Sequence, residues 1–209
     1  MTMTPEDIEA LFTRRDGSYA FARWGRPIAP IVFGVEDDTL KTFKGALEAL
    51  SAITRHPLAE TDPELGSNLM FFLFRDWSEL RGVPDLGRLV PELDSLVPRL
   101  EGEGANQYRL FRFDAQGAIK AAFSFIRMDE SLQKWSAESL ALMQAVQVFV
   151  MWGDGAFAER SPLARLSTGG ADILRPEIAS VLTAAYAPEL PATANDPAHA
   201  LRLFARTQA

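Results

Sequence analysis

The chain has 209 residues, of which 47% are hydrophobic, so it can bury one sizeable core or two small ones. Its formal net charge of −7 argues against nucleic acid as a partner, because a phosphate backbone is bound by clustered Lys and Arg. Cysteine is absent, which excludes disulfides, thiolate zinc sites and cysteine nucleophiles and fits a reducing compartment.

The amino-terminal segment, MTMTPEDIEALFTRRDG, lacks the basic start and long apolar stretch of a secretory signal. No segment reaches the roughly 18 unbroken apolar residues that are needed to cross a bilayer. We therefore expect a cytoplasmic protein that does not span a membrane, organised as a single domain over residues 1–209.

The first elements follow from caps and periodicity. Thr4, Pro5 and the acids after them are typical of a helix start. Residues 19–24 and 28–33 favour two strands, and an amphipathic helix of about 15 residues should begin at Asp37. The short apolar run 69–74 predicts a central strand that is buried on both faces.

The middle of the chain combines short helices with a hairpin. Asp76 can cap a short helix, and residues 86–100 show helical spacing that Pro91 and Pro98 should divide or kink. Residues 106–113 and 118–128 flank a four-residue connection that ends in glycine, which predicts a β-hairpin.

The region after residue 131 changes to a helical period. Its most apolar run, Leu140 to Trp152, has only Gln144 and Gln147 as polar side chains, and Gly153-Asp154-Gly155 should end the helix. No residue of this run can act as an acid, base, nucleophile or strong metal ligand at neutral pH. We expect it to organise the core and not to perform a reaction.

Two further helices are expected, from Pro176 to Tyr186 and from residue 195 to about Arg206. The complete pattern predicts the α+β class: a small mixed β-sheet with a β-hairpin in a sheet-rich part (19–128), helices packed on the sheet, and a helical C-terminal part (129–209).

Several catalytic and cofactor motifs are missing. Neither of the phosphate-binding glycine patterns GxxxxGK[ST] and GxGxxG occurs. The GxSxG motif that carries the nucleophile of many serine hydrolases is also missing. The chain has two histidines: His56 lies beside a proline in a predicted loop, and His199 lies in the last predicted helix. A zinc site needs three or four converging ligands, so we expect neither metal nor cofactor.

Charged and aromatic residues offer two weaker candidates. Arg23, Trp24 and Arg26 combine cations with a ring and could hold an anionic or planar ligand, although a strand edge with a packed Trp is the simpler interpretation. The acidic loop with Asp62 could supply a general acid, or it could be a solvated loop, since acid catalysis needs a desolvated carboxyl group.

Several short sequence segments, taken in chain order, resemble those of a known family. Phe21-Ala22-Arg23-Trp24, followed by Arg26-Pro27-Ile28 and a strand ending in Gly34, looks like the opening of a bacterial zincin-like family, domain of unknown function 2927. Thr54 to Leu58 is similar to that family's histidine-proline segment, and Asn68 precedes the next strand as an asparagine does there. The resemblance implies a zincin-like fold.

Later segments extend the resemblance and also limit it. Gln144-Ala145 is similar to a glutamine-alanine pair in the family's late helix, and Leu174 to Leu190 resembles its carboxy-terminal helix and ending. In the family, acidic residues stand just before that glutamine, where this chain has Leu140 and Ala141. Members also tend to be exported and to contain cysteines. The resemblance therefore implies a divergent scaffold that lacks the metal and acid residues.

Three functions remain open. The first is a non-catalytic binding or interaction domain, in which Gln144, Gln147, Trp152, Arg23 and Trp24 line a groove for an unknown small molecule or protein. The second is a hydrolase that uses Asp62 or Asp154 with His56, which requires a cleft joining them. The third is a structural subunit of a homo-oligomer, such as a homodimer. The residues expected to bind a ligand are Arg23, Trp24, Arg26, His56, Asn68, Gln144, Gln147 and Trp152.

Overall fold

The computed structural model describes residues 3–166 and 170–208 and confirms the α+β class. The elements are, in chain order, α1 (Pro5–Ala10), β1 (Phe21–Ala22), β2 (Pro30–Phe33), α2 (Asp37–Thr54), β3 (Leu69–Phe74), the 3-10 helix η1 (Trp77–Gly82), α3 (Leu86–Leu89), α4 (Leu93–Gly102), β4 (Gln107–Phe113), β5 (Ile119–Arg127), the 3-10 helix η2 (Leu132–Lys134), α5 (Ala137–Phe149), β6 (Leu163–Arg165), β7 (Asp172–Leu174), α6 (Pro176–Ala185), β8 (Thr193–Ala194) and α7 (Ala198–Thr207).

A mixed four-stranded sheet forms the centre of the fold. Its strand order is β2-β3-β5-β4, with β2, β3 and β5 parallel and β4 antiparallel to β5. The predicted hairpin is confirmed, because β4 and β5 pair across the connection that Gly117 closes at φ 84°. β3 is an inner strand, as predicted, and every residue in it is buried. β4 lies at the edge of the sheet.

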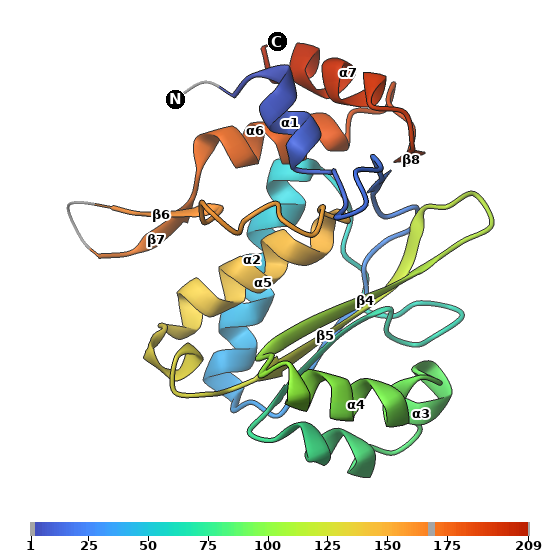
Figure 1. Ribbon diagram of the computed structural model, residues 1–209. Coiled ribbons are helices and arrows are strands. Elements are labelled where there is room, and N and C mark those ends of the chain that lie inside the picture. The colour runs from blue at the N-terminus through green and yellow to red at the C-terminus, as the bar shows by residue number, and fades with distance from the viewer. Residues whose placement is uncertain (1–2, 167–169, 209) are drawn as a thin grey trace.

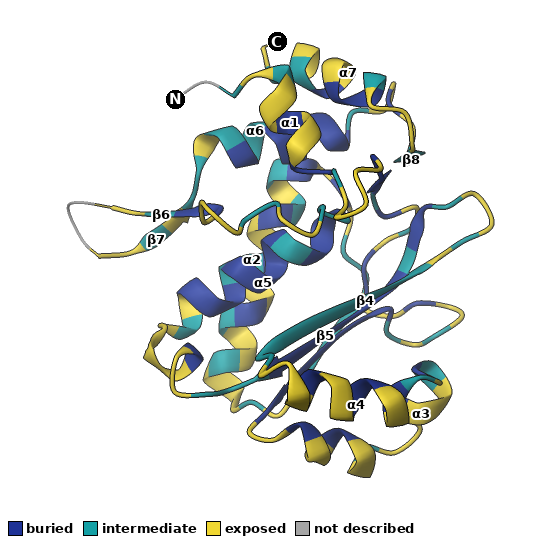
Figure 2. Ribbon diagram, viewed as in Figure 1, coloured by how far each residue is buried: buried dark blue, intermediate teal, exposed yellow. Residues whose placement is uncertain are grey.

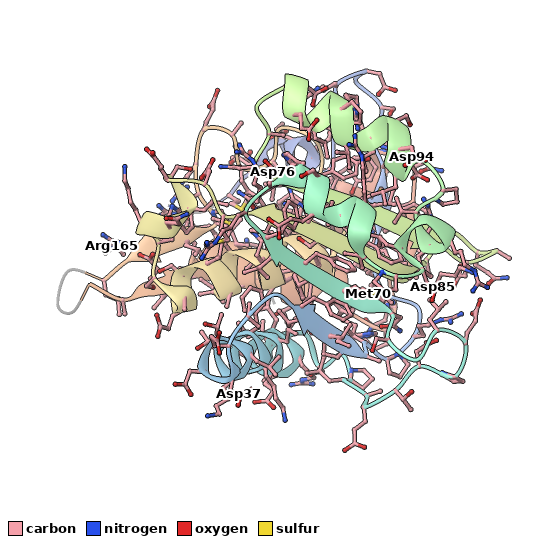
Figure 3. The ribbon with its side chains drawn as sticks, turned by 90° about the horizontal axis from the view of Figure 1, so that it is seen from below. Asp37, Met70, Asp76, Asp85, Asp94 and Arg165 are labelled. Atoms are coloured by element: carbon pink, nitrogen blue, oxygen red, sulfur yellow. The ribbon has the colours of Figure 1, made fainter. Side chains whose placement is uncertain are left out.

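Helices cover both faces of this sheet (Figures 1 and 2). Helices α2 and α5 lie on one face, and η1, α3 and α4 lie on the other. Because side chains alternate along a strand, β3 supplies both cores: Leu69, Phe71 and Leu73 pack with α2 and α5, whereas Met70, Phe72 and Phe74 pack with η1, α3 and α4. Seen from below, Asp37 on α2 and Asp94 on α4 lie on opposite sides of the sheet (Figure 3).

Helices α1, α6 and α7 pack at the end of the molecule that holds both chain termini (Figure 1). The helix start predicted at Thr4 is confirmed, and the structure completes it as a capping box: the Thr4 hydroxyl accepts the Asp7 N–H, and the Asp7 carboxylate accepts the Thr4 N–H. Within the described ranges, no helix has both the length and the apolarity that a membrane crossing requires.

The predicted apolar helix ends earlier than expected. α5 stops at Phe149, and Val150 is extended and bridges Arg23, so Met151 and Trp152 are not helical. Side chains take over the last carbonyls of the helix: the Trp24 indole donates to Val148, the Tyr186 hydroxyl to Phe149 and the Trp152 indole to Val146. These distant donors satisfy carbonyls that a continued helix would have used.

Within its described residues, the predicted helical C-terminal part also contains three short strands. β6 and β7 form a small antiparallel hairpin, and β8 pairs with β1 from the opposite end of the chain. Each of these strands has only two or three residues, which is too short for a periodic pattern, and the β1–β8 pairing depends on contacts that only the folded chain makes.

Candidate functional site

A cleft of about 970 Å³ lies along the edge strand β4. Its walls come from four parts of the chain: the turn after α1, the end of α4, strand β4, and the C-terminal end of α5 with the segment that follows it. Figure 1 shows that α5 and α4 lie on opposite faces of the sheet to which β4 belongs. Of the residues predicted to bind a ligand, Gln147 and Trp152 line this cleft.

Alternation along β4 determines which side chains enter the cleft wall beside α5. Gln107 contacts α5 through a hydrogen bond, and Phe111 packs on the core that contains α5, so Arg109 between them shares this face. All three side chains are partly exposed and line the cleft.

Trp152 is held in place by an aromatic cluster. Its ring stacks on Phe12 at a centroid distance of 5.2 Å and meets Phe157 edge-on at 4.9 Å. Its indole N–H donates to the Val146 carbonyl at 2.9 Å. The ring therefore forms a fixed apolar wall of the cleft.

Gln144 is fully buried and does not reach the cleft. The Ser124 hydroxyl donates to its amide oxygen at 3.0 Å, and its amide nitrogen donates to the Gln107 side-chain oxygen at 2.6 Å. Gln144 is thus a satisfied core amide and not a groove residue, which corrects the expectation from sequence. Through this chain of bonds it fixes the orientation of Gln107, whose NH₂ group has no partner among the described residues.

Four arginines line the cleft together with two carboxylates. Glu103 lies 3.8 Å from Arg99, and Asp154 accepts the backbone N–H of Arg15 at 2.9 Å. Cations therefore outnumber anions here, in a chain whose formal net charge is −7. The cleft is a locally basic region of an acidic protein. The four cations are Arg14, Arg15, Arg99 and Arg109.

Arg109 differs from the other three because it is partly buried, whereas they are exposed. Like Arg14 and Arg15, and unlike Arg99, it makes no ion pair with a carboxylate of residues 3–166 or 170–208. Desolvation lowers the pKa of Arg109 to about 10, so the side chain stays charged at neutral pH. This residue was not predicted from the sequence. The signal that could have found it was its alternation with Gln107 and Phe111, which places a cation on the helix-covered face of the predicted hairpin.

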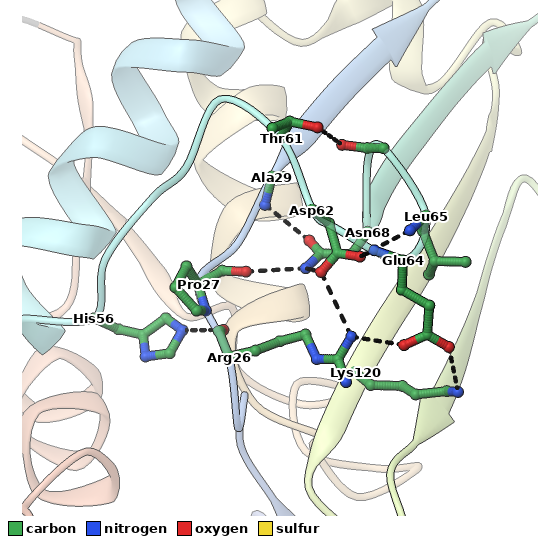
Figure 4. Close-up of polar contacts among 11 residues, drawn as sticks. Arg26, Pro27, Ala29, His56, Thr61, Asp62, Glu64, Leu65, Asn68 and Lys120 are labelled. Atoms are coloured by element: carbon green, nitrogen blue, oxygen red, sulfur yellow. Dashed lines mark hydrogen bonds and ion pairs between the residues drawn. The ribbon is translucent and has the colours of Figure 1, made fainter.

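Three further predicted residues, Arg26, His56 and Asn68, lie around the loop that connects α2 to β3 (Figure 4). Asn68 is buried and organises it: its side-chain oxygen accepts the Ala29 N–H at 2.8 Å, and its NH₂ group donates to the Pro27 carbonyl at 2.9 Å and to Asp62 at 3.1 Å. These hydrogen bonds to other protein groups use both the oxygen and the NH₂ group of the Asn68 side chain.

Asp62 and Arg26 are also engaged in this loop (Figure 4). Burial raises the pKa of Asp62, but the N–H groups of Leu65 and Glu64, the Asn68 amide and the Arg26 charge outweigh that effect and leave it below its ordinary value. Arg26 pairs with Asp62 at 3.5 Å and with Glu64 at 3.0 Å. The cluster ties the loop to the start of β2.

His56 lies at the beginning of the same loop. Its Nε2–H donates to the Arg26 carbonyl at 2.9 Å, its ring lies 4.9 Å from that of Tyr186, and burial lowers its pKa. His56 and Asp62 do not line the cleft, whereas Asp154 does. The cleft that a hydrolase using these groups would require is therefore not formed by them.

Arg23 and Trp24 contact other parts of the protein. Trp24 is fully buried and cannot line a groove, which corrects the expectation that this residue binds a ligand. Arg23 donates to the Leu190 carbonyl at 3.2 Å, and its guanidinium lies 5.4 Å from the centre of the Tyr186 ring. Both residues connect the 19–24 segment to the C-terminal part of the chain.

The donor set does not fit a zinc ion. Among the side chains that the structure describes, no three His, Asp or Glu residues converge as metal ligands do. Leu140 and Ala141, where the family resemblance would place acidic residues, are buried in the apolar core. No family model, curated protein or solved structure matches the chain.

Proposed function

We propose that this protein is a non-catalytic binding domain whose ligand occupies the cleft along β4. The observation that carries the proposal is the set of residues that line the cleft. It combines fixed aromatic rings, such as Trp152, with hydrogen-bond donors that have no protein partner in the described structure, such as the NH₂ group of Gln107. Concave sites with apolar walls and a few polar groups are typical of small-molecule binding.

The same set of residues argues against catalysis. None of the described residues lining the cleft is a Ser, Thr, Cys, His or Lys, so no nucleophile is paired with a base. The two carboxylates, Glu103 and Asp154, are exposed and already contact Arg99 and the Arg15 backbone. Exposed carboxylates lack the desolvation that general acid catalysis uses.

The sequence supports our proposals for the scaffold and for the cellular compartment. We propose a degenerate zincin-like scaffold of a bacterial cytoplasmic protein. The short motifs described above support the scaffold, and the absence of cysteine supports a reducing compartment. An apolar α5 packed on a mixed sheet is compatible with a scaffold that has kept its shape without metal-binding residues.

Binding can be tested by ¹⁵N NMR with a library of small aromatic and aliphatic molecules. We expect signals to shift at the Trp152 indole N–H and the Gln147 side-chain amide. The indole signals of Trp24, which is buried and does not line the cleft, and of Trp135, which is exposed outside the cleft, serve as internal controls. Shifts confined to residues outside the cleft, or no shifts with any molecule, would contradict the proposal.

A further inference from the structure

We propose that the ligand of this cleft carries a carboxylate or phosphate group and that the guanidinium of Arg109 binds this group. The inference rests on the proposed binding function and adds the chemical class of the ligand: a small organic oxyanion with an aromatic or apolar body. Three observations carry it: the pairing of the arginines, the nearby donors and the apolar walls.

Arg109 is partly buried, yet its side chain makes neither an ion pair nor a hydrogen bond with the described residues. Arg23 and Arg175 are also partly buried without a carboxylate partner, but they donate to the carbonyls of Leu190 and Ser161. The other partly buried arginines are ion-paired. Arg112, on the same strand, makes two contacts of 3.2 Å with Glu92; Arg127 lies 3.8 Å from Asp129; and Arg26 pairs with Asp62 and Glu64. A cation removed from water without a counter-charge destabilises a fold. In the described parts of the chain, the counter-charge of Arg109 is not supplied by the protein, and a bound anion would supply it.

Neighbouring groups favour an oxyanion over other ligands. Gln107, two residues away on the same face of β4, has an NH₂ group that is oriented by Gln144 and is not used by the described protein groups. Arg14 and Arg99 on the cleft walls add positive potential. A guanidinium with an adjacent amide donor matches the two oxygens of a carboxylate or phosphate.

The apolar part of the ligand is indicated by the aromatic residues that line the cleft. Trp152, Phe157 and Phe111 line the cleft, and its volume of about 970 Å³ is within the usual range for small organic ligands. An inorganic anion alone would leave these rings without a partner. The arrangement therefore points to an aromatic or aliphatic acid, or to a phosphate ester.

The experiment compares three probes of similar shape and one inorganic ion by NMR titration at constant ionic strength: benzoate, phenyl phosphate, neutral benzamide and inorganic phosphate. We expect benzoate and phenyl phosphate to bind the wild type more tightly than benzamide. Inorganic phosphate should bind more weakly than phenyl phosphate, because it lacks the ring. Equal binding of the two would overturn the apolar part of the proposal.

Three variants separate Arg109 from general charge effects. Arg109→Gln should weaken benzoate binding by about tenfold or more, the usual scale for one charge-assisted hydrogen bond, and leave benzamide unchanged. Arg109→Lys keeps the charge but lacks the planar guanidinium, which can donate two parallel hydrogen bonds. This variant should retain part of the preference for benzoate. Arg112→Gln, on the same strand but outside the cleft, should bind benzoate like the wild type.

Thermal unfolding adds a readout that does not depend on the probes. Because Arg109 has no counter-charge in the described structure, Arg109→Gln should melt at the same temperature as the wild type or higher, which also shows that the variant folds. Benzoate that binds Arg109→Gln as tightly as the wild type would overturn the oxyanion inference while leaving the binding function intact. If no probe shifts any cleft signal, both proposals are overturned.

Discussion

Gln144 is a polar side chain in an otherwise apolar helix, and two hydrogen bonds explain how the core accommodates it. It accepts from Ser124 on β5 and donates to Gln107 on β4, so it connects α5 with both strands of the hairpin. Burying an amide without partners would cost free energy, but here each end of the amide is bonded. One buried residue thereby orients a side chain that lines the cleft.

Replacing Gln144 with methionine tests this role. Gln144→Met keeps the side-chain volume but leaves the Ser124 hydroxyl and the Gln107 oxygen without their partner, so we expect a loss of about 1 to 3 kcal/mol in the free energy of unfolding. Urea unfolding measures it. Gln147→Met is the matched control, one turn away on the same helix, because its amide has no hydrogen bond to the described protein; its stability should stay within about 0.5 kcal/mol of wild type.

Close backbone contact with the turn after α1 positions the segment that follows α5. The Gly153 N–H donates to the Leu11 carbonyl at 2.7 Å, and a Cβ at Gly153 would lie 2.2 Å from the Thr13 carbonyl oxygen. This glycine does not stop the helix, which ends at Phe149; it lets the segment with Trp152 approach the turn after α1. Two walls of the cleft are joined at this point.

Gly153→Ala should therefore disturb both stability and the cleft. A Cβ would displace backbone atoms of Thr13, and we expect a loss of about 1 to 3 kcal/mol in the free energy of unfolding, together with a shifted Trp152 indole signal. Gly155→Ala is the control, because a Cβ at Gly155 would have no other atom within 4 Å. Equal effects of the two substitutions in urea unfolding and NMR would show that close packing at Gly153 does not position the segment.

Two histidines are buried, where their neutral form is favoured, and one partly exposed carboxylate is held in its charged form by hydrogen bonds. Acid protonates all three. Burial lowers the pKa of His199 to about 4, with help from the charges of Arg202 and Arg23, and burial also lowers the pKa of His56. Hydrogen bonds hold the pKa of Asp129 below its ordinary value. In each case the unfolded chain binds protons more readily than the folded chain, so stability falls with falling pH.

The pH dependence should have two phases. Since unfolded histidine titrates near pH 6.5, stability should be full above that pH, decline as the pH falls toward about 4, and decline further as the carboxylates protonate. The His199 contribution is on the order of 2 to 3 kcal/mol. Urea midpoints at pH 7.5, 5.5 and 4.5 measure the slope, which His199→Gln should reduce. An NMR titration of His199 near pH 6.5 would contradict this explanation.

Local patterns in the sequence were sufficient for most of the elements. The run 69–74 predicted an inner strand because continuous apolar residues require cover on both faces, and the connection at Asp114 to Gly117 predicted the hairpin because its turn chemistry is local. The cap at Thr4 placed the start of α1 correctly. These features depend on neighbours within a few residues, which a sequence shows directly.

The cleft depended on contacts between distant residues, and only the tertiary structure decided it. Gln147 and Trp152 were recognised in the sequence, but their partner Arg109 was not, because its lack of a counter-charge follows from which carboxylates the fold brings near. The end of α5 likewise depends on donors from Trp24 and Tyr186. By itself, the sequence determined most of the elements, the acidic charge and the absence of cysteine. The fold decided which polar groups are satisfied inside the protein and which remain for a ligand, because that balance is a property of all neighbours in space.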